Sequence, residues 1–222
     1  AASFVNRPDQ NKFGTVGQPM PGTELKIADD GEILIKSRGI MGGYYNLPDV
    51  TEATLIDGWL HTGDIGEVDA DGHLRITDRK KNLIKTSGGK YVAPQALEGG
   101  FKAICPYVSQ ILVHGDRRNF CSALVTLDEE AIGAWASENG MNGDYAEISQ
   151  SDAVQGMMQG YFDDLNKGLA RFETIKRFAV LPEDFTVENA MLTPSLKVKR
   201  KAVENQYAEL LDGFYSESMA EL

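Results

Sequence analysis

The sequence has 222 residues, 42% of them hydrophobic, and a formal net charge of −11. This length can bury one or two hydrophobic cores, while the acidic charge excludes a general nucleic-acid-binding surface. The sequence holds no apolar run of about 18 residues and no secretory signal pattern, so we expect a cytoplasmic protein and leave peripheral membrane contact open.

The first third of the sequence predicts short strands joined by glycine turns. Leu25–Ile27 and Glu32–Lys36 flank the turn at 28–31, which is a hairpin signal. The segments 66–69 and 73–77 flank a second turn in the same way. The aspartates of this second turn could be mistaken for a calcium loop, but the 12-residue spacing and the closing Glu are absent. We predict no metal ligands.

The remaining two thirds predict an α+β arrangement. Pro94 suits the first turn of a helix, and Asp128 can cap a helix that reaches Asn139. The other expected elements are strands at 110–113, 121–126 and 175–181, and helices at 151–170 and 198–211. Neither Cys105 nor Cys121 has ligand spacing, so we expect both to be small buried apolar residues in a reducing compartment.

Four segments carry a resemblance that covers nearly the whole chain. They are 14–19 (GTVGQP) with 42–46 (GGYYN), 58–64 (GWLHTGD), 78–82 (DRKKN) with 86–90 (TSGGK), and 193–200 (TPSLKVKR). In this order they resemble the adenylate-forming superfamily of acyl-CoA synthetases, luciferases and peptide-synthetase adenylation domains, most of all the long-chain fatty-acid–CoA ligases. The resemblance implies a mixed fold. Residues 1–78 would be the β-rich end of a large N-terminal domain with a distorted barrel, and residues 79–222 a small, mobile α+β lid.

The resemblance implies that Asp64 and Arg79 bind the nucleotide. Without it, a Gly-Asp pair after a strand more often marks a turn, and an Arg after a strand is usually a solvated charge. The chemistry suits the implied roles. An ionised carboxylate can accept hydrogen bonds from both ribose hydroxyls of ATP, and a guanidinium presents paired donors to ribose or phosphate oxygens.

Three further residues are placed by the resemblance on moving parts. Lys81 falls at the hinge residue, although a surface Lys is the plainer interpretation. Gly88 and Gly89 fall in a loop that lets the pantetheine arm of CoA pass its backbone, and the absence of Cβ suits such a close approach. The plainer interpretation of the two glycines is a tight turn.

The resemblance gives Lys197 the catalytic role. In that role its ammonium bridges the substrate carboxylate and the α-phosphate during adenylation, where a cation stabilises developing negative charge. Taken alone, the run Lys197–Lys201 is a solvated basic face. Many relatives have Gly before this Lys; Leu196 stands there in this sequence, which mildly favours the long-chain class.

The implied reaction joins a long-chain fatty acid to CoA through an acyl-adenylate, with ATP consumed as its Mg2+ complex and no tightly bound metal. The ATP phosphate loop and the acyl pocket of such enzymes would lie upstream of this sequence, so we expect the 222 residues alone to be inactive. The sequence leaves chain-length specificity and oligomeric state open. Alternatives are a peptide-synthetase or luciferase-like adenylating enzyme, or a binding module that kept the fold and lost catalysis.

Overall fold

The computed structural model describes residues 3–220, with side chains through residue 216. The chain divides into two compact units, residues 1–83 and 84–222. No helix in the described range is long and apolar enough to cross a membrane.

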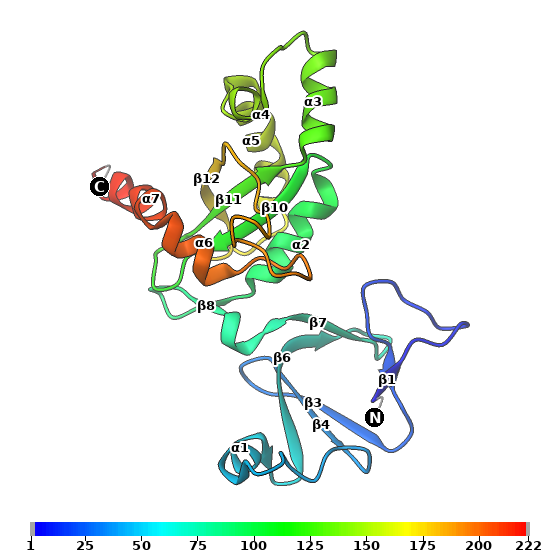
Figure 1. The fold of residues 1–222 in the computed structure, drawn as a ribbon. Coiled ribbons are helices and arrows are strands. Elements are labelled where there is room, and N and C mark those ends of the chain that lie inside the picture. The colour runs from blue at the N-terminus through cyan, green and yellow to red at the C-terminus, as the bar shows by residue number, and fades with distance from the viewer. Residues whose placement is uncertain (1–2, 221–222) are drawn as a thin grey trace. The chain divides into compact units, whose positions relative to one another are not determined.

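The first unit is β-rich. Its long strand β6 (Trp59–Val68) pairs with three other strands, so that the sheet has the order β3-β4-β6-β5 with β7 also on β6. The sheet curls as β6 bends from one set of partners to the other (Figure 1). The remaining elements are β1 (Phe4–Val5), β2 (Gln18–Pro19), β3 (Thr23–Ile27), β4 (Glu32–Ser37), α1 (Pro48–Thr54), β5 (Leu55–Ile56), β7 (Leu74–Arg79) and a 3-10 helix (Lys80–Asn82).

Both predicted hairpins are present in this unit. Strands β3 and β4 pair in register with Ile27 opposite Ile33, and Gly31 takes a φ of +83° in the turn between them. That left-handed conformation is accessible to glycine because it has no Cβ. Strands β6 and β7 form the second hairpin. The curled sheet agrees with the expected β-rich part of the fold.

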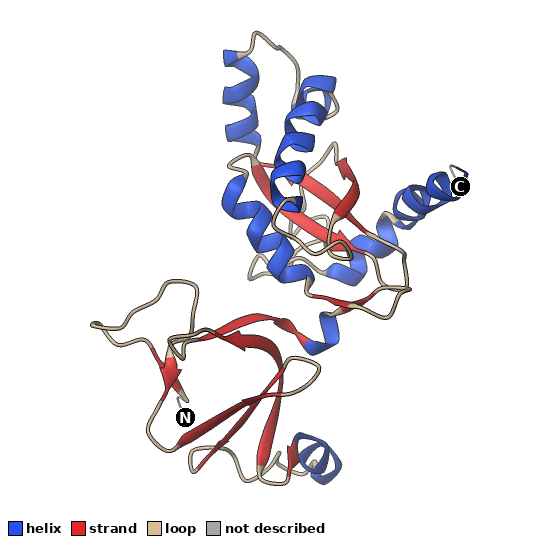
Figure 2. Ribbon diagram, turned by 180° about the vertical axis from the view of Figure 1, so that it is seen from behind, coloured by secondary structure: helices blue, strands red, loops and turns tan. Residues whose placement is uncertain are grey.

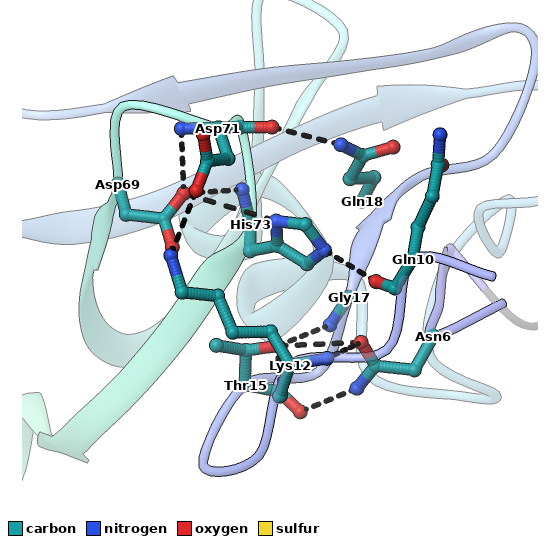
Figure 3. A network of polar contacts seen from close by, with 9 residues as sticks. All are labelled: Asn6, Gln10, Lys12, Thr15, Gly17, Gln18, Asp69, Asp71 and His73. Carbon is teal, nitrogen blue, oxygen red and sulfur yellow. Dashed lines mark hydrogen bonds and ion pairs between the residues drawn. The ribbon is translucent and has the colours of Figure 1, made fainter. Parts of the chain in front are cut away.

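The turn between β6 and β7 owes its shape to Asp69 (Figure 3). Asp69 Oδ1 accepts hydrogen bonds from the N–H groups of Asp71 at 2.9 Å and His73 at 3.0 Å. The ammonium of Lys12 lies 2.6 Å from Asp69 Oδ2 and lowers the pKa of Asp69 to about 2. His73 Nε2 lies 2.8 Å from the Gln10 carbonyl oxygen, so the turn also holds the loop that precedes β2.

The second unit is a sheet covered by helices (Figure 2). Its strands have the order β10-β11-β12, with β10 antiparallel and β12 parallel to the central β11. A small pair, β8 (Ile84–Lys85) and β9 (Tyr91–Val92), precedes them. The other elements are α2 (Pro94–Ile104), β10 (Val108–His114), β11 (Cys121–Leu127), α3 (Glu129–Glu138), α4 (Tyr145–Ser149), α5 (Asp152–Asn166), β12 (Ile175–Val180), α6 (Arg200–Gln206) and α7 (Ala208–Ala220).

Strand β11 is buried on both faces because each face has its own hydrophobic cluster. On one face α2, α3 and α5 pack on the sheet, with the rings of Phe101 and Phe162 stacked 4.2 Å apart. On the other face the loop after β12 and helices α6 and α7 contribute Leu192, Val203 and Leu211. The α+β architecture predicted for this part is confirmed.

Both cysteines are buried, as expected. Cys105 is 1% exposed and Cys121 is fully buried in the cluster beneath α2 and α5. Burial raises the pKa of Cys121 to about 11. The thiol therefore stays protonated at neutral pH and packs as an apolar side chain.

The structure corrects several predicted helix limits. The helix expected at 198–211 is two helices, because α6 begins at Arg200 and ends before Tyr207, whose φ of −107° and ψ of 24° interrupt it. The helix expected at 151–170 ends at Asn166, whose side chain bonds the backbone of Ile175 at 2.8 and 2.9 Å. Helices α1 and α4 were not predicted.

Candidate functional site

Asp64 and Arg79 lie directly opposite each other in the β6–β7 register. Their side chains form an ion pair that is open to solvent, with 25% of Asp64 and 50% of Arg79 exposed. The N–H of Asp64 donates to Thr62 Oγ1 at 3.1 Å, and Thr62 Oγ1 donates to the Ile33 carbonyl at 2.7 Å. Asp64 therefore stands within a strand rather than in the turn that its Gly-Asp pair suggests. A carboxylate and a guanidinium side by side offer an acceptor and a donor to one polar ligand.

Glu32 contacts the residues that precede Asp64 on β6, and no local sequence pattern indicated this role. Its side chain is 5% exposed and contacts three groups: His61 Nδ1 at 3.0 Å, the Gly63 N–H at 2.9 Å and Lys80 Nζ at 2.9 Å. Burial by itself would raise the pKa of Glu32, but the hydrogen bonds from Lys80, His61 and Gly63 outweigh it and lower the pKa. A buried carboxylate in this setting stays ionised because charged and N–H donors satisfy it.

The segment expected to hold the hinge is the 3-10 helix directly after β7. Lys80 is tied to the first unit by ion pairs with Asp30 at 2.7 Å and Glu32 at 2.9 Å, which raise the pKa of Lys80. Lys81 is exposed, and the two units divide two residues later, between Leu83 and Ile84. A backbone at this position could rotate while Lys80 keeps its contacts.

The glycine loop is a closed turn between β8 and β9. The Thr86 N–H donates to the Lys90 carbonyl at 2.9 Å, and the Gly89 N–H donates to the Thr86 carbonyl at 2.8 Å. Gly89 has a φ of +76°, and no atom lies within 4 Å of where its Cβ would be. Gly88 is equally open, with only Thr86 Oγ1 at 4.0 Å. Both glycines are exposed, so a ligand could approach the backbone closely.

This loop is fixed to the turn between β10 and β11. The Ser87 N–H donates to the Arg118 carbonyl and the Arg117 N–H donates to the Lys85 carbonyl, both at 2.8 Å. Asp116 Oδ1 also accepts from the Lys85 N–H at 3.1 Å. The loop is therefore held in place by the second unit itself.

Lys197 ends a tight turn in the loop before α6. The Thr193 N–H donates to the Lys197 carbonyl at 2.8 Å, and the Lys197 N–H donates to Thr193 Oγ1 at 3.1 Å. Leu192 and Val198 pair as a β-bridge that closes the turn. The Lys197 side chain is exposed. The turn therefore presents an ammonium to solvent from a defined backbone position.

Leu196 adopts the left-handed region, with a φ of +58°, and is 66% exposed. Such a conformation costs a residue with a Cβ about 1–2 kcal/mol. The resemblance implies Gly at this position in many adenylate-forming enzymes, and a left-handed φ is a conformational reason for glycine there.

The structure brings Asp64 and Arg79 together in the first unit and places Gly88, Gly89 and Lys197 in the second. Residue roles toward nucleotide, CoA and hinge stay predictions. Among the described residues there is no group of three or more His, Cys, Asp or Glu side chains that could hold a metal ion.

Comparisons with known proteins agree with this architecture. The profile of the family described as AMP-binding enzyme C-terminal domain matches residues 81–219. The chain is 40% identical over 207 residues to the long-chain-fatty-acid–CoA ligase FadD15 of Mycobacterium tuberculosis. The aligned region covers 92% of the chain and 34% of the ligase. It is 36% identical over 231 residues to the human long-chain-fatty-acid–CoA ligase 1, covering 97% of the chain and 33% of that ligase.

A solved structure shares the fold. The A domain of the carboxylic acid reductase from Segniliparus rugosus, in complex with AMP and a co-purified carboxylic acid, aligns with a TM-score of 0.68 and 27% identity. The alignment covers 91% of the chain and 32% of that protein. The chain thus spans about a third of the length of the relatives it matches.

Proposed function

We infer the function of this chain from its membership of the AMP-binding enzymes, a family to which it belongs because the C-terminal domain profile matches residues 81–219. We propose that it is part of an acyl-CoA synthetase that activates a long-chain fatty acid with ATP and transfers it to CoA. The observation that carries the proposal is the presence, in family order, of the Asp64–Arg79 pair, the open glycine loop and the exposed Lys197 turn.

In the first step the fatty carboxylate attacks the α-phosphorus of ATP, forming an acyl-adenylate and releasing pyrophosphate. Asp64 would accept hydrogen bonds from the ribose hydroxyls, and Arg79 would donate to nucleotide oxygens. The ammonium of Lys197 would neutralise charge that develops between the carboxylate and the α-phosphate. Mg2+ would enter with the ATP phosphates, and no residue of this chain is assigned to it.

In the second step the CoA thiolate attacks the acyl carbon, and AMP leaves with the bonding electrons of the broken acyl–oxygen bond. Adenylation turns a poor leaving group into a good one and so divides a difficult displacement into two easier steps. The pantetheine arm would pass the exposed backbone of Gly88 and Gly89, where no side chain obstructs it.

Each step would use a different face of the second unit. Rotation of the backbone near Lys81 would exchange the Lys197 turn for the glycine loop at the reacting centre. Support comes from the exposed position of Lys81 and from the residue before it, Lys80, whose ion pairs fix it to other residues of the first unit. The mobile lid and its hinge are part of the proposal.

The long-chain acyl specificity is supported by the names of the two relatives described above, both of which are long-chain-fatty-acid–CoA ligases. Each relative is about three times as long as the aligned part. The upstream two thirds would hold the acyl pocket and most of the ATP site. We also propose that the enzyme is cytoplasmic.

The test is palmitoyl-CoA formation from palmitate, Mg-ATP and CoA, measured for this chain and for the full gene product. We expect activity only in the full protein. Activity in neither, with ATP still bound by the full protein, would point to a different acid or acceptor. Activity in the 222 residues alone would overturn the placement of the acyl and ATP sites upstream.

A further inference from the structure

Three groups form a closed ring at the edge of the second unit's sheet. The Val113 N–H donates to Glu98 Oε1 at 2.8 Å, and Arg200 Nη2 donates to the same oxygen at 2.5 Å. Arg200 Nη1 completes the ring by donating to the Val113 carbonyl at 2.7 Å. The ring joins helix α2, strand β10 and helix α6.

The ring satisfies the outward-facing backbone of an edge strand. Among the strands of the described residues, β10 pairs only with β11, so groups on its other side need different partners. Glu98 and Arg200 supply an acceptor and a donor to Val113, and their side chains are only 15% and 23% exposed. Partly buried, charge-assisted hydrogen bonds are stronger and more rigid than exposed ion pairs.

The position of Arg200 connects the ring to Lys197. Arg200 follows Lys197 by three residues, and the residues between them are also held. Val198 bridges Leu192, and the Lys199 N–H donates to the Met191 carbonyl at 2.8 Å. Contacts with the preceding segment therefore hold the backbone at each residue between the Lys197 turn and the ring.

Glu98 provides the corresponding link to the glycine loop. It lies on α2, which begins at Pro94, two residues after the end of the β9 strand that closes the loop. One residue pair thus ties the segment that carries Lys197 to the segment that follows Gly88 and Gly89.

We propose that Glu98 and Arg200 are positioning residues that fix the Lys197 turn on strand β10, so that the ammonium of Lys197 enters the adenylation site at a set place. This rests on the proposed function, in which Lys197 acts in adenylation. Two features argue for positioning rather than a plain ion pair. Arg200 donates from two nitrogens that its planar guanidinium holds at a fixed spacing, which the single nitrogen of Lys does not reproduce. One Glu98 oxygen accepts hydrogen bonds from both Arg200 and the Val113 N–H.

A second side-chain contact made by the same helix provides a matched control. Glu204 Oε1 lies 3.1 Å from His114 Nδ1, so it also docks α6 on β10. It lies one helical turn after Arg200 and takes no part in the ring at Val113. Loss of Glu204 would loosen the helix without opening the ring.

The experiment uses the full-length enzyme with the variants Arg200→Lys, Glu98→Ala, Glu98→Gln, Glu204→Ala and Lys197→Ala. Palmitate-dependent pyrophosphate release gives kcat and KM for ATP in adenylation, and conversion of supplied palmitoyl-adenylate measures the CoA step. Thermal unfolding of each variant reports whether it is folded.

We expect Arg200→Lys and Glu98→Ala to lower the adenylation kcat about tenfold or more with little change in KM, because small displacements of a catalytic group are costly. The CoA step should stay within about twofold of the parent. Glu98→Gln should recover most of the adenylation rate, because the amide oxygen can accept the same two hydrogen bonds. Glu204→Ala should adenylate like the parent.

Equal losses in both steps, or a loss in Glu204→Ala that matches Arg200→Lys, would overturn the positioning role. So would normal adenylation in Arg200→Lys and Glu98→Ala while Lys197→Ala is inactive, a result that leaves the proposed function intact. Normal adenylation in Lys197→Ala would instead overturn the proposed function itself.

Discussion

The carboxylate of Asp64 contacts the guanidinium of Arg79 across two paired strands, in a register that sets the two residues opposite each other. The backbone hydrogen bonds of β6 and β7 therefore fix their relative position. Two proposed nucleotide-binding groups are preorganised by a hairpin.

Replacing Arg79 should weaken nucleotide binding with little effect on the stability of the fold. We expect Arg79→Ala in the full-length enzyme to weaken AMP binding about tenfold or more, since charge-assisted hydrogen bonds are lost. The free energy of unfolding should change by less than about 1 kcal/mol, because the pair is solvent-exposed. Isothermal titration with AMP and urea unfolding measure both. Arg75→Ala, on the same strand, is the control, and unchanged AMP affinity in Arg79→Ala would exclude the proposed role.

Replacing Lys197 should impair one half of the reaction. In Lys197→Ala we expect adenylation to slow by about 10²–10³-fold, since a single stabiliser of developing charge is removed. Transfer from supplied palmitoyl-adenylate to CoA should be largely retained. Rapid-quench assays of the two half-reactions provide the comparison, with Lys201→Ala as the control. Equal loss of both half-reactions would refute the assignment.

The two loop glycines should respond differently to alanine. A Cβ at Gly88 meets only Thr86 Oγ1 at 4.0 Å, so Gly88→Ala should keep the parent's melting temperature. The CoA step should nevertheless slow by about tenfold, since a side chain now stands where the backbone is approached. Gly89→Ala should destabilise the second unit by about 1 kcal/mol because its φ is left-handed. An unaltered CoA step in Gly88→Ala would remove Gly88 from the CoA path.

Leu196→Gly should stabilise the chain by about 0.5–1 kcal/mol. Relief of about 1–2 kcal/mol of left-handed strain exceeds the entropic cost of glycine. Little burial is lost, since Leu196 is 66% exposed. Urea unfolding measures the change, and Leu196→Ala, which keeps a Cβ, is the control that should show no such gain. If the two variants are equally stable, strain at this position is negligible.

Glu32→Gln should destabilise the first unit at neutral pH by about 1–3 kcal/mol, because Lys80 and His61 lose a buried charged partner. The folded state lowers the pKa of Glu32 below its ordinary value of 4.5. Its stabilisation is therefore fully present above about pH 4.5 and is lost as the pH falls through the lower, folded value.

The difference in unfolding free energy between the parent and Glu32→Gln should accordingly shrink as the pH is lowered below about 4.5. Urea titrations across this range test it, with Glu24→Gln on the exposed side of β3 as the control. A difference that stays constant with pH would mean that ionised Glu32 contributes no net stabilisation.

Local patterns in the sequence predicted most of the elements but not their exact ends. Hairpin turns at Gly31 and Gly72, and the cap at Asp128, are decided by neighbouring residues, and these predictions are confirmed. The limits of α6 depend on contacts that are distant in sequence. Val198 and Lys199 pair with Leu192 and Met191, so the helix cannot begin until Arg200.

The candidate residues were identified by resemblance, whereas their supporting partners required the structure. Glu32 stands at the start of an apolar run. The pattern of apolar and polar residues in that run does not reveal that Lys80, 48 residues later, donates a hydrogen bond to Glu32. Glu98 and Arg200 are 102 residues apart. Pairings of this kind are set by tertiary packing, and no local pattern encodes them.

Both faces of the β10–β11–β12 sheet are covered by segments within residues 84–215. We therefore expect that the second unit can be exchanged between related enzymes as a module. Its hydrophobic core is supplied by its own sequence. Joined after Leu83 to the corresponding region of another AMP-binding enzyme, it should carry its Lys197 turn and glycine loop with it. A chimera of this kind would reveal which kinetic properties belong to the transplanted part and which to its host.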